Sequence, residues 1–307
     1  MISERRKLFW HLSLINYHLS LFCLRHGFLL IDKPSGITSH DAVVIVRNRL
    51  SERAVGHLGT LDPAATGLLV LAVGKKALKV VHLFGDLSKE YIADVHFGAM
   101  SSTYDREGVI EETPPKPGWK EPDQLAIQNL IESRFLGKIK QVPPSHSAVH
   151  VNGERAFRLA REGKEVIIPP RVVQIDSCNV LEYKYPNLKL RIACGSGTYI
   201  RSLAHDLGKL LWCGGYLLGL QRTRVGEWSL DHAKAPDAAL WTDVIPLKEI
   251  LKSHPSRELT SHEWEDISHG RNIEAEVAPN TIAWQDELPV AILVPGPDGT
   301  ARAKKVF

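Results

Sequence analysis

The stretch of this chain best suited to chemistry is residues 56–67, with the sequence GHLGTLDPAATG. It holds three glycines and a single acidic side chain, Asp62. Pro63 biases Asp62 away from the helical region, and the glycines permit positive φ or a close backbone approach. We therefore expect Asp62 to lie on a tight loop around a ligand, where a carboxylate can act as a nucleophile. The alternative is a simple chain reversal, which Asp-Pro and glycine commonly form.

Two further motifs accompany this loop. Asp32-Lys33-Pro34-Ser35-Gly36 lies upstream, and residues 195–208, GSGTYIRSLAHDLG, lie far downstream. Arg201 in the second motif is the candidate partner of Asp62, because desolvation alone would raise the pKa of an aspartate and neutralise it. A guanidinium can bind a carboxylate through two parallel hydrogen bonds and keep it charged. An arginine that only stabilises the start of a helix is the alternative.

Strands and helices are expected to position these motifs. Apolar runs and alternation predict strands, and caps with helical periodicity predict helices, one of them beginning at Thr38 or Ser39. The expected strands are 27–32, 68–73, 89–98, 166–182, 188–194 and a last one at 218–228. The expected helices are 38–50, 75–84, 123–135, 156–161 and one within 195–208.

The composition is that of a folded protein with a sizeable core. The chain has 307 residues, of which 44% are hydrophobic, and this length predicts about two domains. Four cysteines show no paired spacing, so neither a disulfide framework nor a zinc site is indicated. The sequence also has no Walker loop and no dinucleotide fingerprint. We therefore expect no metal and no cofactor.

Residues 1–26 superficially resemble a signal peptide, with basic residues before an apolar stretch. No small-residue cleavage site follows, and the stretch is too short and polar to span a membrane. We interpret it as a poorly defined leader on a cytoplasmic enzyme with no membrane association. An over-long start of the reading frame is the alternative.

The three motifs, in this order, resemble the TruB family of tRNA pseudouridine synthases, and the resemblance spans about residues 27–228. It implies an α+β fold: a catalytic domain with a mixed, largely antiparallel sheet flanked by helices, followed by a small β-rich, PUA-like domain. We place the catalytic domain at 27–254 and the C-terminal domain at 255–307. The net charge of the chain is +3. The C-terminal domain has five Lys and Arg against nine Asp and Glu, so the basic surplus lies with the motifs, where an RNA backbone needs it.

The resemblance implies roles for several residues. Asp62 matches the catalytic aspartate of the family, and Tyr91, in Lys89-Glu90-Tyr91, matches the tyrosine that stacks on the target base. Tyr199 is expected on the other face of that base, and His57 in the position that the flipped nucleotide leaves. Lys33 is expected to support the pocket or the RNA. The alternatives are a core aromatic for Tyr91, surface polarity for His57 and an ordinary turn lysine for Lys33.

Two segments depart from the family pattern. The family commonly has Thr-Asp-Thr-x-Asp where this chain has residues 101–105, SSTYD, so only the second aspartate, Asp105, is retained near the site. The family's Leu-Arg-Arg-Thr is Leu220-Gln221-Arg222-Thr223 here. Leu220 and Arg222 are expected to contact the base or the RNA, and Arg222 and Arg224 are candidates for phosphate contacts.

The function that the resemblance implies is isomerisation of uridine to pseudouridine in the T-loop of tRNA, at position 55 of the tRNA convention. The expected partner is the T-arm of tRNA, and the enzyme is expected to be a monomer. Whether Asp62 attacks the base, attacks the sugar or first acts as a base stays open. A tRNA-binding or tRNA-folding protein that uses the same cleft without chemistry is the alternative. A nucleotide-phosphate binder would need a lysine-serine signature that is missing.

Overall fold

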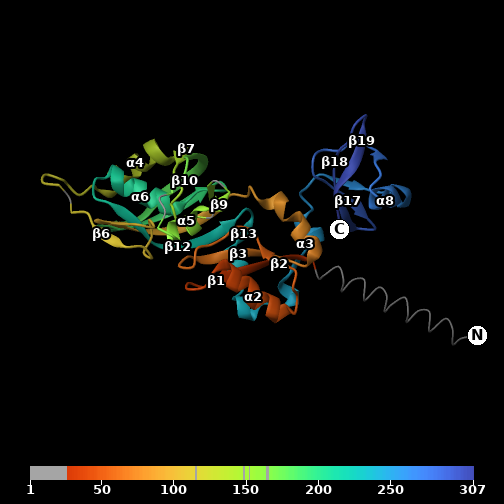
Figure 1. The fold of residues 1–307 in the computed structure, drawn as a ribbon, viewed down its shortest axis with the longest axis horizontal. Coiled ribbons are helices and arrows are strands. Elements are labelled where there is room, and N and C mark those ends of the chain that lie inside the picture. Colours follow the sequence, from red (N-terminus) through yellow and green to blue (C-terminus); the bar gives the residue numbers. More distant parts are fainter. Residues whose placement is uncertain (1–25, 115, 148, 152, 164–165) are drawn as a thin grey trace, which may run out of the picture.

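The computed structural model describes residues 26–114, 116–147, 149–151, 153–163 and 166–307. The predicted leader lies outside this range. A ten-stranded sheet forms the larger part of the molecule, and a five-stranded sheet forms the other end (Figure 1). Across the large sheet the strands are β14 (Ile245–Pro246), β1 (Gly27–Lys33), β3 (Thr66–Val73), β12 (Gly215–Val225), β4 (Lys89–Phe97), β11 (Asn187–Cys194), β10 (Arg171–Lys184) and β7 (Gly137–Gln141), with β2 (Val55–His57) paired to β3 and β13 (Trp228–Ser229) to β12.

The large sheet is mixed. Strand β12 runs parallel to β3, and the other paired strands in it are antiparallel. β12 lies between β3 and β4, which are consecutive long strands in the chain. The predicted α+β fold with a mixed, largely antiparallel sheet is confirmed.

The helices begin where capping residues predict. Thr38 caps α2 (Ser39–Leu50), and its side chain and that of Asp41 each accept from the other's backbone N–H. This reciprocal arrangement satisfies two backbone donors that the first turn leaves free. Asp123 caps the helix that begins at Gln124, where its side-chain oxygen accepts from the backbone amide of Ala126. The helices of this part of the chain are α2, α3 (Lys75–Val80) followed by a 3-10 turn (Val81–Phe84), α4 (Gln124–Phe135), α5 (Ala156–Arg161) and α6 (Ile200–Leu210).

Strands β1 and β3 are buried on both faces. Phe28 and Leu30 of β1 join one core cluster, whereas Leu29 and Ile31 join the other. Helix α2 supplies side chains to the second cluster, and α3 to the first. A strand covered on both sides has no polar face, which explains the continuous apolar run from 68 to 73. The loop that carries Asp62 is therefore anchored in a rigid part of the sheet.

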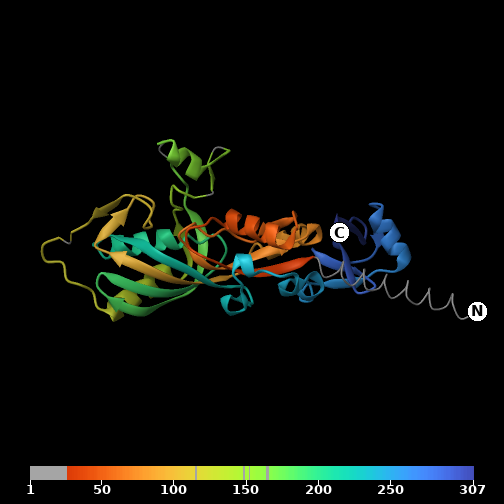
Figure 2. The same ribbon diagram turned by 90° about the horizontal axis from the view of Figure 1, so that it is seen from below.

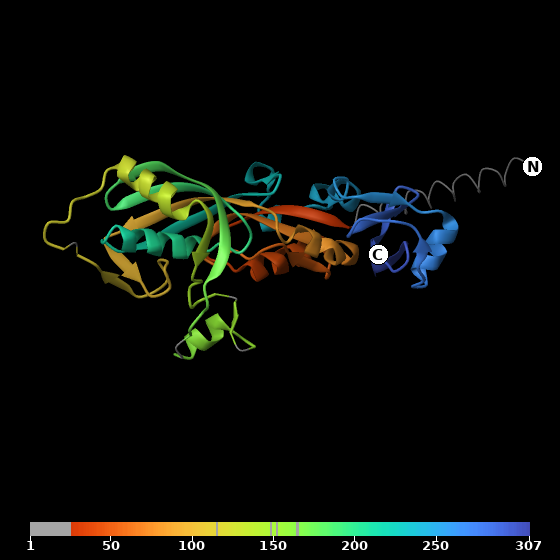
Figure 3. The ribbon, with the colours of Figure 1, turned by 90° about the horizontal axis from the view of Figure 1, so that it is seen from above.

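Two short excursions leave the large sheet. β8 (His150–Val151), β9 (Glu154–Arg155) and α5 form an arm that stands out from one face (Figures 2 and 3). β5 (Ala99–Ser101) and β6 (Ile110–Glu112) form a hairpin at the end away from the small sheet (Figure 1).

The C-terminal part is the β-rich domain that the sequence predicts. Its strands lie in the order β15 (Ser256–Glu258), β17 (Thr281–Gln285), β18 (Leu288–Pro295), β19 (Thr300–Val306) and β16 (Ile273–Glu274), with α8 (Ser261–Ser268) beside them and α7 (Leu247–Ile250) before them. Ile282 and Ile292 pack into the same cluster as Phe28. Lys79 Nζ of α3 donates to Val306 O at 2.5 Å. The small domain is thus packed on the catalytic sheet.

Two predicted strands differ from the observed ones. β10 begins at Arg171 rather than at 166, because Pro169 and Pro170 cannot donate to a strand ladder. β12 is not the last strand of the large sheet, since β13 and β14 follow it. Among the residues that the structure describes, no helix has the length and apolar character needed to cross a membrane.

Candidate active site

The turn between β1 and α2 holds the loop that carries Asp62. Lys33 Nζ donates to Pro34 O at 2.8 Å, to Ile37 O at 2.8 Å and to Pro63 O at 3.2 Å. Ser39 Oγ accepts from the backbone amide of Leu61 at 2.8 Å and donates to Leu61 O at 2.9 Å. The residues on both sides of Asp62 are therefore fixed by the Asp-Lys-Pro-Ser-Gly motif and by the first residue of α2.

Lys33 is fully buried, and its hydrogen bonds go to backbone carbonyls at the two ends of this turn and loop. Burial lowers the pKa of its ammonium, and the nearby charge of Asp62 opposes that shift. Of the roles open from the sequence, support of the pocket is the one that this geometry fits.

Replacing Lys33 with methionine should lower the free energy of unfolding by about 2–4 kcal/mol, because buried carbonyls lose their donor. Urea denaturation measures this. Lys184→Met, at an exposed lysine of β10, serves as the control and should stay within about 0.5 kcal/mol of the native chain. Equal stability of the two variants would show that Lys33 does not hold the loop.

Glycine is required where the loop meets β12. Gly67 has φ +96°, and a Cβ atom there would lie 2.4 Å from Arg222 O. Gly59 has φ +94°. Both conformations favour glycine, and the first also leaves no room for a side chain. The glycine spacing of the motif therefore follows from the path of the loop.

Asp62 and Arg201 form the ion pair that the sequence predicts. Arg201 Nε lies 3.0 Å from Asp62 Oδ2. The Arg201 side chain is 7% exposed, whereas that of Asp62 is 42% exposed. The arginine is thus part of the protein interior, and the carboxylate faces open space.

The other two nitrogens of the Arg201 guanidinium bind neighbouring segments. Nη1 lies 3.4 Å from Asp105 Oδ2 and donates to Thr103 O at 3.3 Å, while Nη2 donates to His146 O at 3.0 Å. Asp105 is itself fixed by the Thr103 hydroxyl at 2.5 Å and the amide of Glu107 at 3.0 Å. Arg201 therefore joins the Asp62 loop, the β5–β6 hairpin and the segment before the arm.

Burial raises the pKa of Asp62, although part of its surface remains open. Among the charges around it, Arg201 and Lys33 lower this pKa and Asp105 raises it. Since burial is the largest influence, the positive charge of Arg201 is what favours the ionised carboxylate. A nucleophile in such a site depends on this cation.

A shallow pocket, open to solvent, lies in front of this ion pair. Asp62, Asp105 and Arg201 form its charged wall together with Arg106. The apolar wall comes from Ala64 and Ala65 of the loop and from residues 217–220 of β12. A pocket with an apolar wall facing convergent polar groups suits a flat, polar ring such as a nucleobase.

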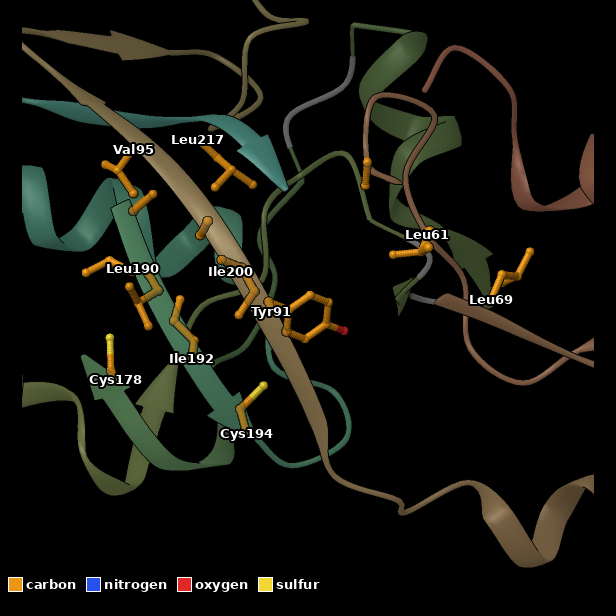
Figure 4. Packing of buried hydrophobic residues seen from close by; sticks show 14 of the residues in the cluster. Leu61, Leu69, Tyr91, Val95, Cys178, Leu190, Ile192, Cys194, Ile200 and Leu217 are labelled. Carbon is orange, nitrogen blue, oxygen red and sulfur yellow. The ribbon is translucent and has the colours of Figure 1, made fainter. Parts of the chain in front are cut away.

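The structure brings Asp62, Asp105, Arg201 and Leu220 together at this pocket. Tyr91 lies next to it: its residue is 8% exposed, and its ring points from β4 toward the loop that carries Leu61 (Figure 4). Burial raises the pKa of the Tyr91 phenol, and the charge of Asp62 contributes to this shift. Tyr91 is both a core aromatic and a neighbour of the Asp62 loop.

His57 and Tyr199 do not line the pocket. His57 ends β2, and its Nδ1 is buried with no hydrogen-bond partner among the described residues. Burial lowers the pKa of His57. The Arg171 guanidinium carbon lies 4.6 Å from the centre of the Tyr199 ring. Arg171 therefore covers one face of the Tyr199 ring.

The prediction that Arg222 contacts an RNA phosphate is wrong. The residue is 1% exposed, and its side chain donates to the backbone carbonyls of Leu68, Gly59 and Thr60. A buried guanidinium whose donors hold carbonyls cannot reach a phosphate. Its neighbour Arg224 is exposed.

Sequence reasoning missed Arg106, Leu217 and Ser39. Arg106 follows Asp105 directly, so its place beside a charged site was a usable signal. Nothing in the sequence marks Leu217 as a pocket residue, or predicts the hydrogen bonds of the Ser39 hydroxyl to the backbone of Leu61. Both depend on how segments distant in sequence pack together. In the part of the chain that the structure describes, no group of three or more His, Cys, Asp or Glu side chains gathers to hold a metal ion.

Known proteins are similar to this chain in sequence and in fold. Residues 47–200 match the sequence profile of the TruB family pseudouridylate synthase N-terminal domain. The tRNA pseudouridine synthase B of Leifsonia xyli subsp. xyli is 41% identical over 257 residues, which cover 80% of this chain and 83% of the relative. That of Mycobacterium sp. (strain KMS) is 39% identical over 289 residues, which cover 89% and 94%.

Solved structures show the same fold at lower identity. The crystal structure of a Cbf5-Nop10-Gar1 complex contains a chain with a TM-score of 0.68 and 22% identity, covering 93% of this chain and 85% of that one. A chain in the structure of an H/ACA RNP bound to a substrate RNA containing 2′-deoxyuridine has a TM-score of 0.67 and 20% identity, covering 93% and 86%. From the profile match and the identity over most of both chains, this chain belongs to the TruB family of pseudouridylate synthases, which are isomerases.

Proposed function

We propose that this protein converts uridine to pseudouridine in the T-loop of tRNA, at position 55, with Asp62 as the reacting carboxylate. The observation that carries the proposal is the Asp62–Arg201 ion pair at the open pocket. The relatives named tRNA pseudouridine synthase B support tRNA as the substrate.

The pocket suits an extruded nucleotide. A uridine stacked in folded RNA is inaccessible, so the enzyme must flip it out, which costs a few kcal/mol. The apolar segment 217–220 offers a surface for the base, and Asp62 faces the space where the base and ribose would lie. Arg106, on the same wall, supplies a positive charge where a phosphate or a carbonyl oxygen can approach.

The reaction needs the detached uracil to turn and rejoin the ribose through carbon 5. In this proposal Asp62 acts on the nucleotide, Arg201 keeps its carboxylate ionised, and Tyr91 packs beside the base. The buried contacts of Arg201 hold its guanidinium in place before substrate arrives, so little reorganisation is needed during the reaction.

We also propose the division into a catalytic domain at 27–254 and a small domain at 255–307. The five-stranded sheet begins at Ser256 and supports this division. The small domain is acidic overall, so we assign the main RNA contacts to the catalytic domain.

Release of tritium from carbon 5 of uridine in a tRNA T-arm transcript tests the proposed function. The native chain should release one tritium per transcript, and a transcript with cytidine at position 55 should give none. Tight binding of the transcript without any release would instead identify a non-catalytic tRNA-binding protein.

A further inference from the structure

Arg222 is a buried cation with an unusual set of partners. Its Nε donates to Leu68 O at 2.7 Å, its Nη2 to Gly59 O at 3.2 Å and its Nη1 to Thr60 O at 3.5 Å. Among the described residues, no carboxylate lies within ion-pair distance of it. Burying an unpaired guanidinium is costly, so its position calls for an explanation beyond packing.

The partners of Arg222 lie on both sides of the reacting carboxylate. Gly59 and Thr60 precede Asp62 in the loop, and Leu68 follows the loop at the start of β3. The planar fork of an arginine can hold several acceptors at fixed separations. One side chain therefore ties the beginning of the Asp62 loop to the strand at its end.

The backbone of Arg222 also fixes Tyr91. In the β12–β4 ladder Arg222 is directly opposite Tyr91, and in the β12–β3 ladder it is opposite Gly67. Side chains of directly opposite residues lie on the same face of a sheet, with Cβ atoms about 5 Å apart. The positive charge of Arg222 lowers the pKa of the Tyr91 phenol, against the larger effect of burial. The guanidinium thus lies between the Asp62 loop and the Tyr91 ring.

We propose that Arg222 is a positioning residue that sets the separation between Asp62 and Tyr91. It contacts neither RNA nor the reacting atoms and acts through the backbone segments that carry these two side chains. This inference rests on the proposed function, since it assigns both residues to one reaction. A displacement of about 1 Å in such a pair can cost about 10²-fold in rate.

Arg222→Lys is the central variant, because lysine keeps the charge and most of the length but loses the planar fork. Arg191→Lys, at the exposed arginine of β11, is the matched control. For each, we measure the single-turnover rate of tritium release, the Kd for the T-arm transcript and the folded fraction by circular dichroism.

The Arg222→Lys variant should stay folded and bind RNA within about twofold of the native chain, while its single-turnover rate falls about 10²-fold. Arg191→Lys should retain the native single-turnover rate. In a Tyr91→Phe background, Arg222→Lys should have a smaller effect than in the native background, because residues that act together are not additive.

A native rate in folded Arg222→Lys, or a loss confined to RNA affinity, would overturn the proposal. If the lysine variant does not fold, Arg222→Gln replaces it, and failure of both to fold would make Arg222 a residue of stability alone. Absence of release by the native chain would defeat the proposed function instead, so the two failures are distinguishable.

Discussion

Replacing Asp62 with asparagine should lower the rate of tritium release by about 10⁴-fold or more, because an amide can neither attack the nucleotide nor accept a proton as a carboxylate does. The binding affinity for the T-arm transcript should change little, because asparagine keeps the size of aspartate and affinity for a nucleic acid depends mainly on its phosphates. Filter binding and single-turnover release, measured on the same preparation, separate the two effects.

The variant should remain folded. Arg201 keeps Asp105, Thr103 and His146 as partners when Asp62 becomes neutral, so no buried cation is left alone. Asp94→Asn is the matched control: its carboxylate is on β4, 48% exposed and 3.9 Å from Lys189. It should keep activity within about twofold, because exposed pairs contribute little. Turnover by Asp62→Asn would remove Asp62 from the mechanism.

Replacing Arg201 with glutamine should lower the rate at neutral pH by about 10²- to 10⁴-fold. Arg201 lowers the pKa of Asp62, so its removal leaves only the weaker effect of Lys33 against burial and raises that pKa further. The protonated carboxyl is inactive. The acid side of the pH–rate profile should therefore move to higher pH, and part of the lost rate should return as the pH rises.

Asp105→Asn provides the opposite test on the same site. Asp105 raises the pKa of Asp62, and it also shares the Arg201 guanidinium. Neutralising Asp105 removes a negative charge near Asp62 and leaves more of the Arg201 charge to Asp62. Both effects lower the pKa of Asp62, so the acid side of the profile should move to lower pH. Single-turnover rates between about pH 5 and 9 measure both shifts. Shifts of the same sign in the two variants, or none in either, would contradict the assigned electrostatics.

The Asp62–Arg201 ion pair was predictable because both residues belong to motifs that resemble the TruB family and have their own local geometry. Asp62 follows a glycine turn and precedes a proline, and Arg201 lies at the start of a helix after a glycine-rich turn. The cap at Thr38 was predictable for the same reason. Turns and helix caps of this kind depend on neighbouring residues, so they can be predicted without knowledge of the rest of the fold.

The roles of Arg222 and Tyr199 were not predictable in this way. Strict alternation along β12 places Arg222 and Arg224 on one face, but a register shift between them separates the buried arginine from the exposed one. The ring of Tyr199 packs against Arg171, the first residue of β10. No local sequence pattern predicts that β10 lies beside Tyr199. Strand β14 has two residues, one of them proline, which is too short for any periodicity.

The central place of β12 determines when the enzyme becomes active during its synthesis. Asp62 precedes β3, whereas Tyr91, Asp105 and Arg201 belong to the part of the sheet that begins with β4, and β12 is the strand that joins these halves. Before residue 225 emerges from the ribosome, the two halves lack the strand that joins them. Contacts between segments so distant in sequence form late and slowly. We therefore expect Asp62 and Arg201 to be held together only when nearly three-quarters of the chain has emerged, and a shorter nascent chain to be inactive on RNA.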